Sequence, residues 1–438
     1  MRMTMSARIG SGLGVALMVG MASMAGRPAP AEDWPQFRGP HRDGSWAEAG
    51  LAETFPDGGP AVGWRQPVAY GWSSPVVAGG RVFVSDAVLE KPVARERLLC
   101  FDEATGKRLW AFDYVAPYPD WAFVPGQGGG PTATPIVQDD RVYVVGANGE
   151  VHCLAVETGA VSWSRKLGEE FEIGSMGCRA SPLIDARRLI LFTGATLDAG
   201  VMALDLETGA TLWRAIDEGI SNSSPVIIKR DDGHHLIVWT TASVFSLNPA
   251  TGALDWREPM TTSNNDCVST PVSHGDRLLI GGLMMEYRPG GAKPAILWPA
   301  DRTVALKRIL SHTSTALCLD GHVYSARMRG ELACLDAATG RELWQTDGIT
   351  EPKSGASIHL TPAADGAVYL FTDEGVLIRA VLSPSGYVER ARAKVIEPTS
   401  PFGSKKCAWS PPAYANGHGY FRNDLEVVCV DLRETRRP

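Results

Sequence analysis

The segment DEATGKRLW, residues 102–110, decides the fold because its pattern returns along the chain. In each copy an Asp, Asn or Ala opens a turn that ends in Thr-Gly, and a Trp stands four residues after the Gly. A carboxylate or amide at the start of such a turn accepts backbone N–H bonds, and Gly supplies the positive φ. The other copies run over residues 155–163, 205–213, 248–256 and 336–344, and Trp298 takes the same place in a copy without Thr-Gly.

A second motif, a Ser or Thr followed by Pro, opens an apolar run once in each period. The hydroxyl residue is kept in eight copies and the proline in seven, at intervals of 43 to 60 residues. The copies begin at Ser74, Thr134, Ser181, Ser224, Thr270, Thr315, Thr361 and Ser410. A regular spacing of this length is typical of a repeated supersecondary unit.

Each period contains four short runs that read as strands joined by tight turns, which is the content of one propeller blade. The last repeat stops at residues 430–432 without a Trp strand, whereas Trp64 has no strands of its own. We therefore predict an all-β, eight-bladed β-propeller of four-stranded antiparallel blades, in which residues 62–67 close the ring. Residues 32–438 form one domain, with an N-terminal segment at 32–67 and eight repeats at 68–438.

Residues 1–31 have the features of an export signal. Arg2 and Arg8 precede an apolar run over 9–25, and Ala29-Pro30-Ala31 is a small-x-small cleavage pattern. We expect a mature chain that starts at Glu32, is soluble after cleavage and lies in the periplasm or outside the cell. The alternative is an uncleaved membrane anchor, although the apolar run is short for a span.

Charge excludes one class of partner. Without residues 1–31 the chain carries 39 basic and 49 acidic residues, a formal charge of −10. Such a surface gives no electrostatic reason to bind nucleic acid or anionic lipid.

The Asp-x-x-Thr-Gly-x-x-x-Trp block resembles the repeat of the pyrroloquinoline-quinone (PQQ) propeller superfamily. That superfamily includes quinoprotein alcohol dehydrogenases and the propeller lipoprotein of the outer-membrane β-barrel assembly machinery. Residues 34–40, WPQFRGP, also resemble a segment of exported propellers of this family from planctomycetes. The resemblance implies the fold and leaves the chemistry open.

Motifs for catalysis and for metal binding are missing from the sequence. Quinoprotein dehydrogenases carry two adjacent cysteines and a Ca²⁺-binding Glu, Asn and Asp set, and neither pattern is found here. We expect no catalytic residue and no metal site, and PQQ with Ca²⁺ is the alternative. Four cysteines at equivalent positions, Cys100, Cys153, Cys334 and Cys429, are expected to be free thiols in the core. For Cys178, Cys267 and Cys407 we favour packing over a metal or disulfide cluster.

The binding surface is expected on the face that carries the longer connections, which we place at residues 86–96, 113–130 and 281–294. Residues just before each Ser/Thr-Pro pair should circle the channel entrance on this face. The candidates are Trp72, Arg179, Asn222, Asp266, His312, His359, Lys406 and Trp409, with Thr132 beside them. They suit an anionic or sugar-like ligand, or they form a solvated pore rim.

These observations favour a non-catalytic exported monomer that binds an envelope protein, peptide or glycan, similar to the outer-membrane assembly propeller. Two alternatives stay open. One is a divergent PQQ-dependent oxidoreductase acting on an alcohol or sugar. The other is a glycan-binding or glycan-processing protein, suggested by the aromatic residues between 114 and 123.

Overall fold

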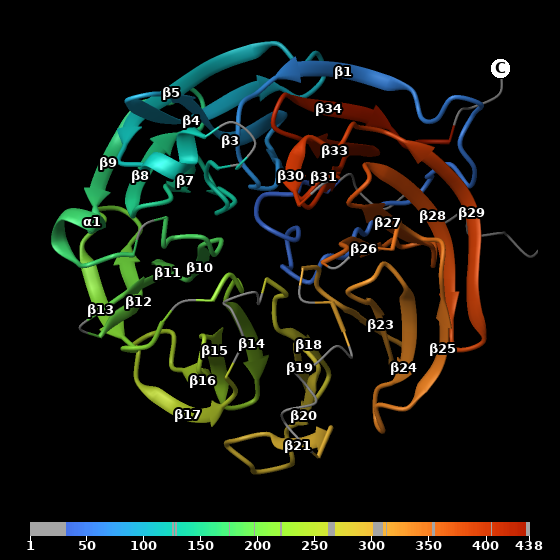
Figure 1. Ribbon diagram of the computed structural model, residues 1–438. Helices are drawn as coiled ribbons and strands as arrows, with labels where there is room; N and C mark the ends of the chain where they lie inside the picture. Colours follow the sequence, from blue (N-terminus) through green and yellow to red (C-terminus); the bar gives the residue numbers. More distant parts are fainter. Residues whose placement is uncertain are drawn as a thin grey trace, which may run out of the picture.

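The computed structural model shows eight four-stranded antiparallel sheets arranged around one axis (Figure 1). It describes residues 32–434 apart from 125, 126, 128, 175, 197, 220, 262–267, 301–309, 312, 353, 354 and 404. In every sheet the strands follow one another in chain order, except where the ring closes. The predicted all-β, eight-bladed propeller is confirmed.

The first four blades have these strands. Blade one holds β2 (Val76–Ala78), β3 (Arg81–Glu90), β4 (Val93–Asp102) and β5 (Arg108–Ala116). Blade two holds β6 (Ile136–Gln138), β7 (Arg141–Val145), β8 (Glu150–Ala155) and β9 (Val161–Lys166). Blade three holds β10 (Leu183–Asp185), β11 (Arg188–Ala195), β12 (Ala199–Asp205) and β13 (Thr211–Ala215). Blade four holds β14 (Val226–Arg230), β15 (Gly233–Trp239), β16 (Ser243–Leu247) and β17 (Leu254–Pro259).

The remaining blades complete the ring. Blade five holds β18 (Val272–His274), β19 (Arg277–Ile280), β20 (Leu283–Glu286) and β21 (Ala295–Trp298). Blade six holds β22 (Leu317–Leu319), β23 (His322–Ala326), β24 (Leu332–Asp336) and β25 (Glu342–Thr346). Blade seven holds β26 (Ile358–Pro362), β27 (Val368–Thr372), β28 (Val376–Ser383) and β29 (Gly386–Lys394). Blade eight holds β32 (Ala413–Ala415), β33 (His418–Arg422), β34 (Glu426–Asp431) and β1 (Val62–Pro67).

Three short elements lie between strands. They are the 3₁₀ helix η1 (Asp120–Phe123), the helix α1 (Leu167–Glu170), and the hairpin of β30 (Ser400–Phe402) and β31 (Lys405–Cys407). None of the helices in the described part of the chain is long and apolar enough to cross a membrane.

Ring closure joins the two ends of the described chain. Strand β1 pairs antiparallel with β34, and Trp64 lies opposite Cys429. Figure 1 shows this blue strand along the outer edge of the red C-terminal blade. The predicted closing strand at 62–67 is therefore β1. Pairing it covers the edge of β34, which would otherwise be free to pair with other chains.

Tryptophans on the outer strands of six blades bind the blade to its neighbour. The Trp110 indole N–H donates to the Val156 carbonyl at 3.0 Å, in the Thr-Gly turn of blade two. The ring also lies over Gly159, where a Cβ would come within 2.6 Å of it. The same bond to a neighbouring turn is made by Trp64, Trp163, Trp213, Trp298 and Trp344. The block that defines the repeat is thus an inter-blade joint.

The repeated hydroxyls make a second seam, around the channel. The backbone N–H of Ser74 donates to Thr134 Oγ1, that of Thr134 to Ser181 Oγ, and that of Ser181 to Ser224 Oγ, each at 3.0 Å. Thr270 donates to Thr315 Oγ1 in the same way. Each bond satisfies a buried donor that water cannot reach, which explains why this position carries a hydroxyl.

Apolar contacts between neighbouring blades form the core. Phe83 and Cys100 of blade one, for example, pack with Val142 and Leu154 of blade two. Cys100, Cys153, Cys334 and Cys429 are buried free thiols, as predicted. Cys178 is also a buried free thiol, and Cys407 is buried. Cys267 lies outside the described residues.

Three sequence-based placements are wrong. Residues 86–96 form the long ends of β3 and β4 instead of a loop, because these strands stay paired as far as Glu90 and Val93. Residues 281–294 are not one insertion. Gly281 and Gly282 turn between β19 and β20, and residues 287–294 join β20 to β21 at the opposite end of the ring.

The third correction concerns blade seven. Thr361 pairs with Tyr369, whereas the equivalent partners in other blades, such as Ile136 opposite Tyr143, lie two residues after the motif hydroxyl. His359 therefore occupies the hydroxyl position of blade seven. The Thr361-Pro362 pair belongs to the end of β26, before a longer turn.

Candidate ligand-binding cavity

The N-terminal segment, residues 34–46, crosses the channel at the end where the tight turns lie. Trp34 exchanges two backbone hydrogen bonds with Val77 of blade one, and Trp46 donates to Pro362 O of blade seven at 2.9 Å. Figure 1 shows this blue segment inside the ring. We call it the plug, because it covers the inner strands on that side.

Arg42 holds the plug to the far wall. Its guanidinium donates to the carbonyls of Ser181, Pro182 and Pro225 at 2.8 to 2.9 Å, on blades three and four. Its backbone lies in the left-handed region, with φ at 59°. Burial, with a smaller contribution from the nearby Arg38, lowers the pKa of Arg42 to about 9, so the side chain is still charged at neutral pH. Three carbonyl acceptors offset part of the cost of burying this cation.

Above the plug the channel holds a cavity of about 370 Å³. Its floor is formed by the plug residues Trp34, Phe37, Arg38 and Gly44. The wall is formed by the starts of the inner strands and includes Trp72, Thr132, Arg179, Asn222, His359, Phe402 and Trp409. This size lies in the range of small-molecule sites, about 300–1,000 Å³.

The structure brings together five of the eight candidate site residues. Trp72, Arg179, Asn222, His359 and Trp409 all line the cavity, as does Thr132. Lys406 does not, because it lies exposed on β31. Asp266 and His312 lie outside the described residues.

Neighbouring side chains hold the indole rings of Trp72 and Trp409 in place. Trp72 Nε1 donates to Ser400 Oγ at 3.1 Å, and Ser400 in turn donates to Asp424 Oδ2 at 2.6 Å. Trp409 packs edge-on against Phe402 of the β30–β31 hairpin, with ring centroids 5.2 Å apart. The hairpin therefore contributes an aromatic face to the mouth of the cavity.

The cavity is electropositive. The described lining residues include Arg38 and Arg179 and no Asp or Glu. Burial lowers the pKa of Arg38 to about 10, so this guanidinium stays cationic at neutral pH. Partial desolvation also lowers the pKa of Arg179. His359 is uncharged at neutral pH, because burial lowers its pKa to about 4. Its Nε2 lies 3.2 Å from the Trp409 carbonyl.

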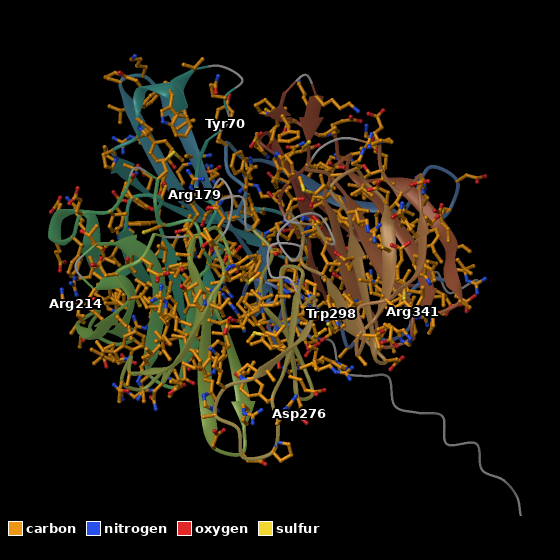
Figure 2. The ribbon with its side chains drawn as sticks, turned by 60° about the horizontal axis from the view of Figure 1, so that its bottom comes forward. Tyr70, Arg179, Arg214, Asp276, Trp298 and Arg341 are labelled. Carbon is orange, nitrogen blue, oxygen red and sulfur yellow. The ribbon has the colours of Figure 1, made fainter. Side chains whose placement is uncertain are left out.

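A smaller side pocket of about 100 Å³ shares Trp72, Thr132 and Arg179 with the cavity. Its outer wall includes Trp121 of η1, whose side chain is 46% exposed. Arg179 thus stands between the two spaces. Figure 2 shows Arg179 and Tyr70 toward one end of the ring and Asp276 at the other.

Next to the side pocket lies a buried acidic cluster that the sequence did not reveal. Glu96, 1% exposed, accepts hydrogen bonds from the Tyr114 and Tyr118 hydroxyls and from the Ala147 N–H. Burial raises its pKa to about 7. Tyr114 and Tyr118 are thereby occupied inside the protein, and of the aromatic residues expected to face a glycan only Trp121 is largely exposed.

The described residues do not fit a Ca²⁺-bound quinone. Ca²⁺ takes six to eight oxygen ligands, several of them carboxylates. The described part of the cavity wall contains no carboxylate. Among the described residues, no group of three His, Cys, Asp or Glu side chains could hold a metal ion. No chemical step through such a cofactor follows from this geometry.

Comparison with known proteins points to one family. A family model described as outer membrane protein assembly factor BamB matches residues 94–286 and 292–384, more than half of the chain. BamB of Burkholderia pseudomallei is 26% identical over 241 residues, which are 51% of this chain and 58% of the relative. BamB of Yersinia pestis is 24% identical over 266 residues, 56% and 64% of the two chains. The alignments thus span less than two thirds of these curated relatives.

Solved structures show the same fold. BamB from Moraxella catarrhalis superposes with a TM-score of 0.55, covering 86% of this chain and 99% of its own. Quinohemoprotein alcohol dehydrogenase from Comamonas testosteroni gives a TM-score of 0.64, covering 93% and 81%. Both are 14% identical to this chain, so the likeness is one of architecture.

Proposed function

The chain belongs to the family of the outer membrane protein assembly factor BamB, and from this we propose that it is an exported, non-catalytic scaffold of the cell envelope. It binds a protein, peptide or glycan partner through the face that carries the cavity mouth. The proposal includes secretion with cleavage before Glu32 and a monomeric ring. Family membership supports the scaffold in general, and the partner and its location are part of the proposal.

The one-sided cavity is the observation that carries this proposal. Among the described residues the plug lies across the channel at one end, which leaves the other end for ligand entry. At that end the extended β3–β4 hairpin and the β30–β31 hairpin stand on either side of the mouth (Figure 2). Exposed apolar side chains, Tyr70, Trp121 and Phe402, lie on these elements or beside them. Aromatic side chains on a rigid frame are typical of recognition surfaces.

Site-specific photocrosslinking in the native envelope tests the proposal. A photoreactive phenylalanine analogue at Phe402 or Trp121 should yield a covalent adduct. The same analogue at Asp276, in a tight turn at the other end of the ring, serves as the matched control. Protease treatment of the adduct separates a polypeptide partner from a glycan. Adducts formed equally well from Asp276, or from none of the three positions, would contradict the proposal.

The alternative function is a PQQ-dependent oxidoreductase, which would bind PQQ and Ca²⁺, whereas the scaffold would not. We expect no stoichiometric binding when the mature protein is titrated with PQQ and Ca²⁺ and followed by absorbance. Tight binding would assign the cavity to the cofactor and would justify a screen of alcohols and sugars.

A further inference from the structure

We infer that the cavity is a binding site for a carboxylate carried on an apolar body, with Arg38 on the floor and Arg179 at the mouth as its cationic partners. This inference rests on the proposed function and names the ligand chemistry of the same site. The carboxylate belongs either to a free organic acid or to the C-terminus of a peptide, and the experiment below separates these sources.

Arg38 is placed in the cavity by a strained piece of backbone. Its φ is 62°, a left-handed conformation that is strained for a residue with a side chain. Gly44 lies directly against the guanidinium, since a Cβ there would come within 3.0 Å of Arg38 Nη2. The plug therefore contains a strained backbone at Arg38 and a glycine at residue 44, where a side chain would contact the guanidinium. Both features leave the guanidinium at the cavity floor.

The charge of Arg38 is not neutralised by an ion pair within the described structure. Its Nη2 donates to the backbone carbonyl of Asp43 at 2.5 Å, and no carboxylate of the described residues lies within 4.0 Å of it. The Asp43 carboxylate is occupied by the N–H and hydroxyl of Ser45. The Asp43 carboxylate is near enough to raise the pKa of Arg38 without pairing with it. A guanidinium whose charge is only partly offset in this way favours an anionic ligand.

Arg179 offers a second cation that lines the same cavity. Its Nε donates to the Met176 carbonyl at 2.9 Å, which fixes the plane of the guanidinium. The side chain is exposed and lines both the cavity and the side pocket. As for Arg38, no carboxylate of the described chain pairs with it. A ligand anion at the mouth would therefore meet donors already held in place.

The rest of the wall indicates what carries the anion. Trp72, Trp409, Phe37 and Phe402 supply flat apolar surface, and Asn222 adds polar contact at the wall. This mixture suits a singly charged carboxylate with an aromatic or aliphatic body better than inorganic phosphate. Phosphate would bring a larger charge and would leave the indoles without a partner.

Calorimetric titration of the mature, full-length protein tests the inference with paired probes. The first pair is 3-phenylpropionate and its amide, which have similar shape and differ in charge. The second pair is a tripeptide ending in Phe, with a free or an amidated C-terminus. We expect at least one of the two acids to bind at least tenfold more tightly than its amide, and binding to weaken as salt is added. The pair that responds identifies the source of the carboxylate.

Three variants test whether acid binding takes place in the cavity. Arg38→Gln and Arg179→Gln should each weaken acid binding at least tenfold, whereas Arg341→Gln should not change it. Arg341 is exposed in a Thr-Gly turn at the far end of the ring and is a matched loss of one positive charge (Figure 2). If Arg38→Gln disturbs the plug, Arg179→Gln still gives the answer, because this side chain is exposed.

Equal binding of acids and amides, or no binding of either acid at millimolar concentration, would overturn the inference. These failures are distinguishable from failure of the scaffold proposal. Crosslinks from Phe402 without acid binding would remove the carboxylate site alone. Acid binding without crosslinks would leave a small-molecule cavity and no macromolecular partner.

Discussion

At the scale of single residues, burial of Glu96 predicts an unusual dependence of stability on pH. The folded protein holds this carboxyl with a pKa of about 7, against about 4.5 for an unperturbed Glu. Between these values the folded state binds more protons than the unfolded state. The free energy of unfolding should therefore fall as pH rises from 4.5 to 7, by up to about 3 kcal/mol. Glu150 is shifted in the same direction and adds to this trend.

The variant Glu96→Gln isolates this contribution, because the amide resembles the protonated acid. Urea unfolding at pH 5 and pH 8 should show a smaller difference between the two pH values in the variant than in the parent. Glu157→Gln is the control, since this side chain is 71% exposed and pairs with Arg81 on the surface. An unchanged pH dependence in Glu96→Gln would show that the buried carboxyl is ionised in the folded protein.

At the scale of the structural element, the contact between Trp110 and Gly159 predicts that one added methyl group at residue 159 lowers the free energy of unfolding strongly. Gly159→Ala adds a Cβ 2.6 Å from the indole and keeps a positive φ of 70°. We expect a loss of about 2–4 kcal/mol in the free energy of unfolding, from strain and overpacking together. Gly275→Ala has the same strain and no neighbour within 4 Å, so about 1 kcal/mol is expected. Equal losses in the two variants, measured by urea unfolding, would argue against the joint.

The same joints explain which elements could be predicted from the sequence. Trp110, Ser74 and β1 belong to a period, so their places follow from repetition. The sequence predicts His359 at the rim but does not indicate its place in the hydroxyl seam, because Thr361-Pro362 resembles the motif two residues later. The plug has no period at all, and the bonds of Arg42 to blades three and four span about 140 to 180 residues. The partnership of Glu96 with Tyr114 depends on how far β3 and β4 stay paired.

At the scale of the whole molecule, the N-terminal region has two separable tasks, which are covering the channel and closing the ring. Residues 34–46 form the plug, and β1 supplies the fourth strand of blade eight. Removing β1 exposes the edge of β34. It also removes Trp64, whose indole N–H donates to the Glu103 carbonyl of blade one at 2.8 Å. Loss of this strand should therefore act on the entire ring, because each blade is held by both neighbours.

Two truncations of the mature chain test this division. Deleting residues 32–67 should lower the melting temperature by more than 10 °C or prevent folding, because closure is lost. Deleting only residues 32–49 keeps β1, so it should cost less stability while removing Arg38 and the cavity floor. Circular dichroism gives the melting temperature and 3-phenylpropionate titration gives the state of the cavity. If both truncations melt alike, β1 contributes nothing that the plug does not, and closure by pairing with β34 is wrong. If the shorter truncation already melts far below the full mature chain, the plug itself holds the ring together, because its bonds reach blades one, three, four and seven at once.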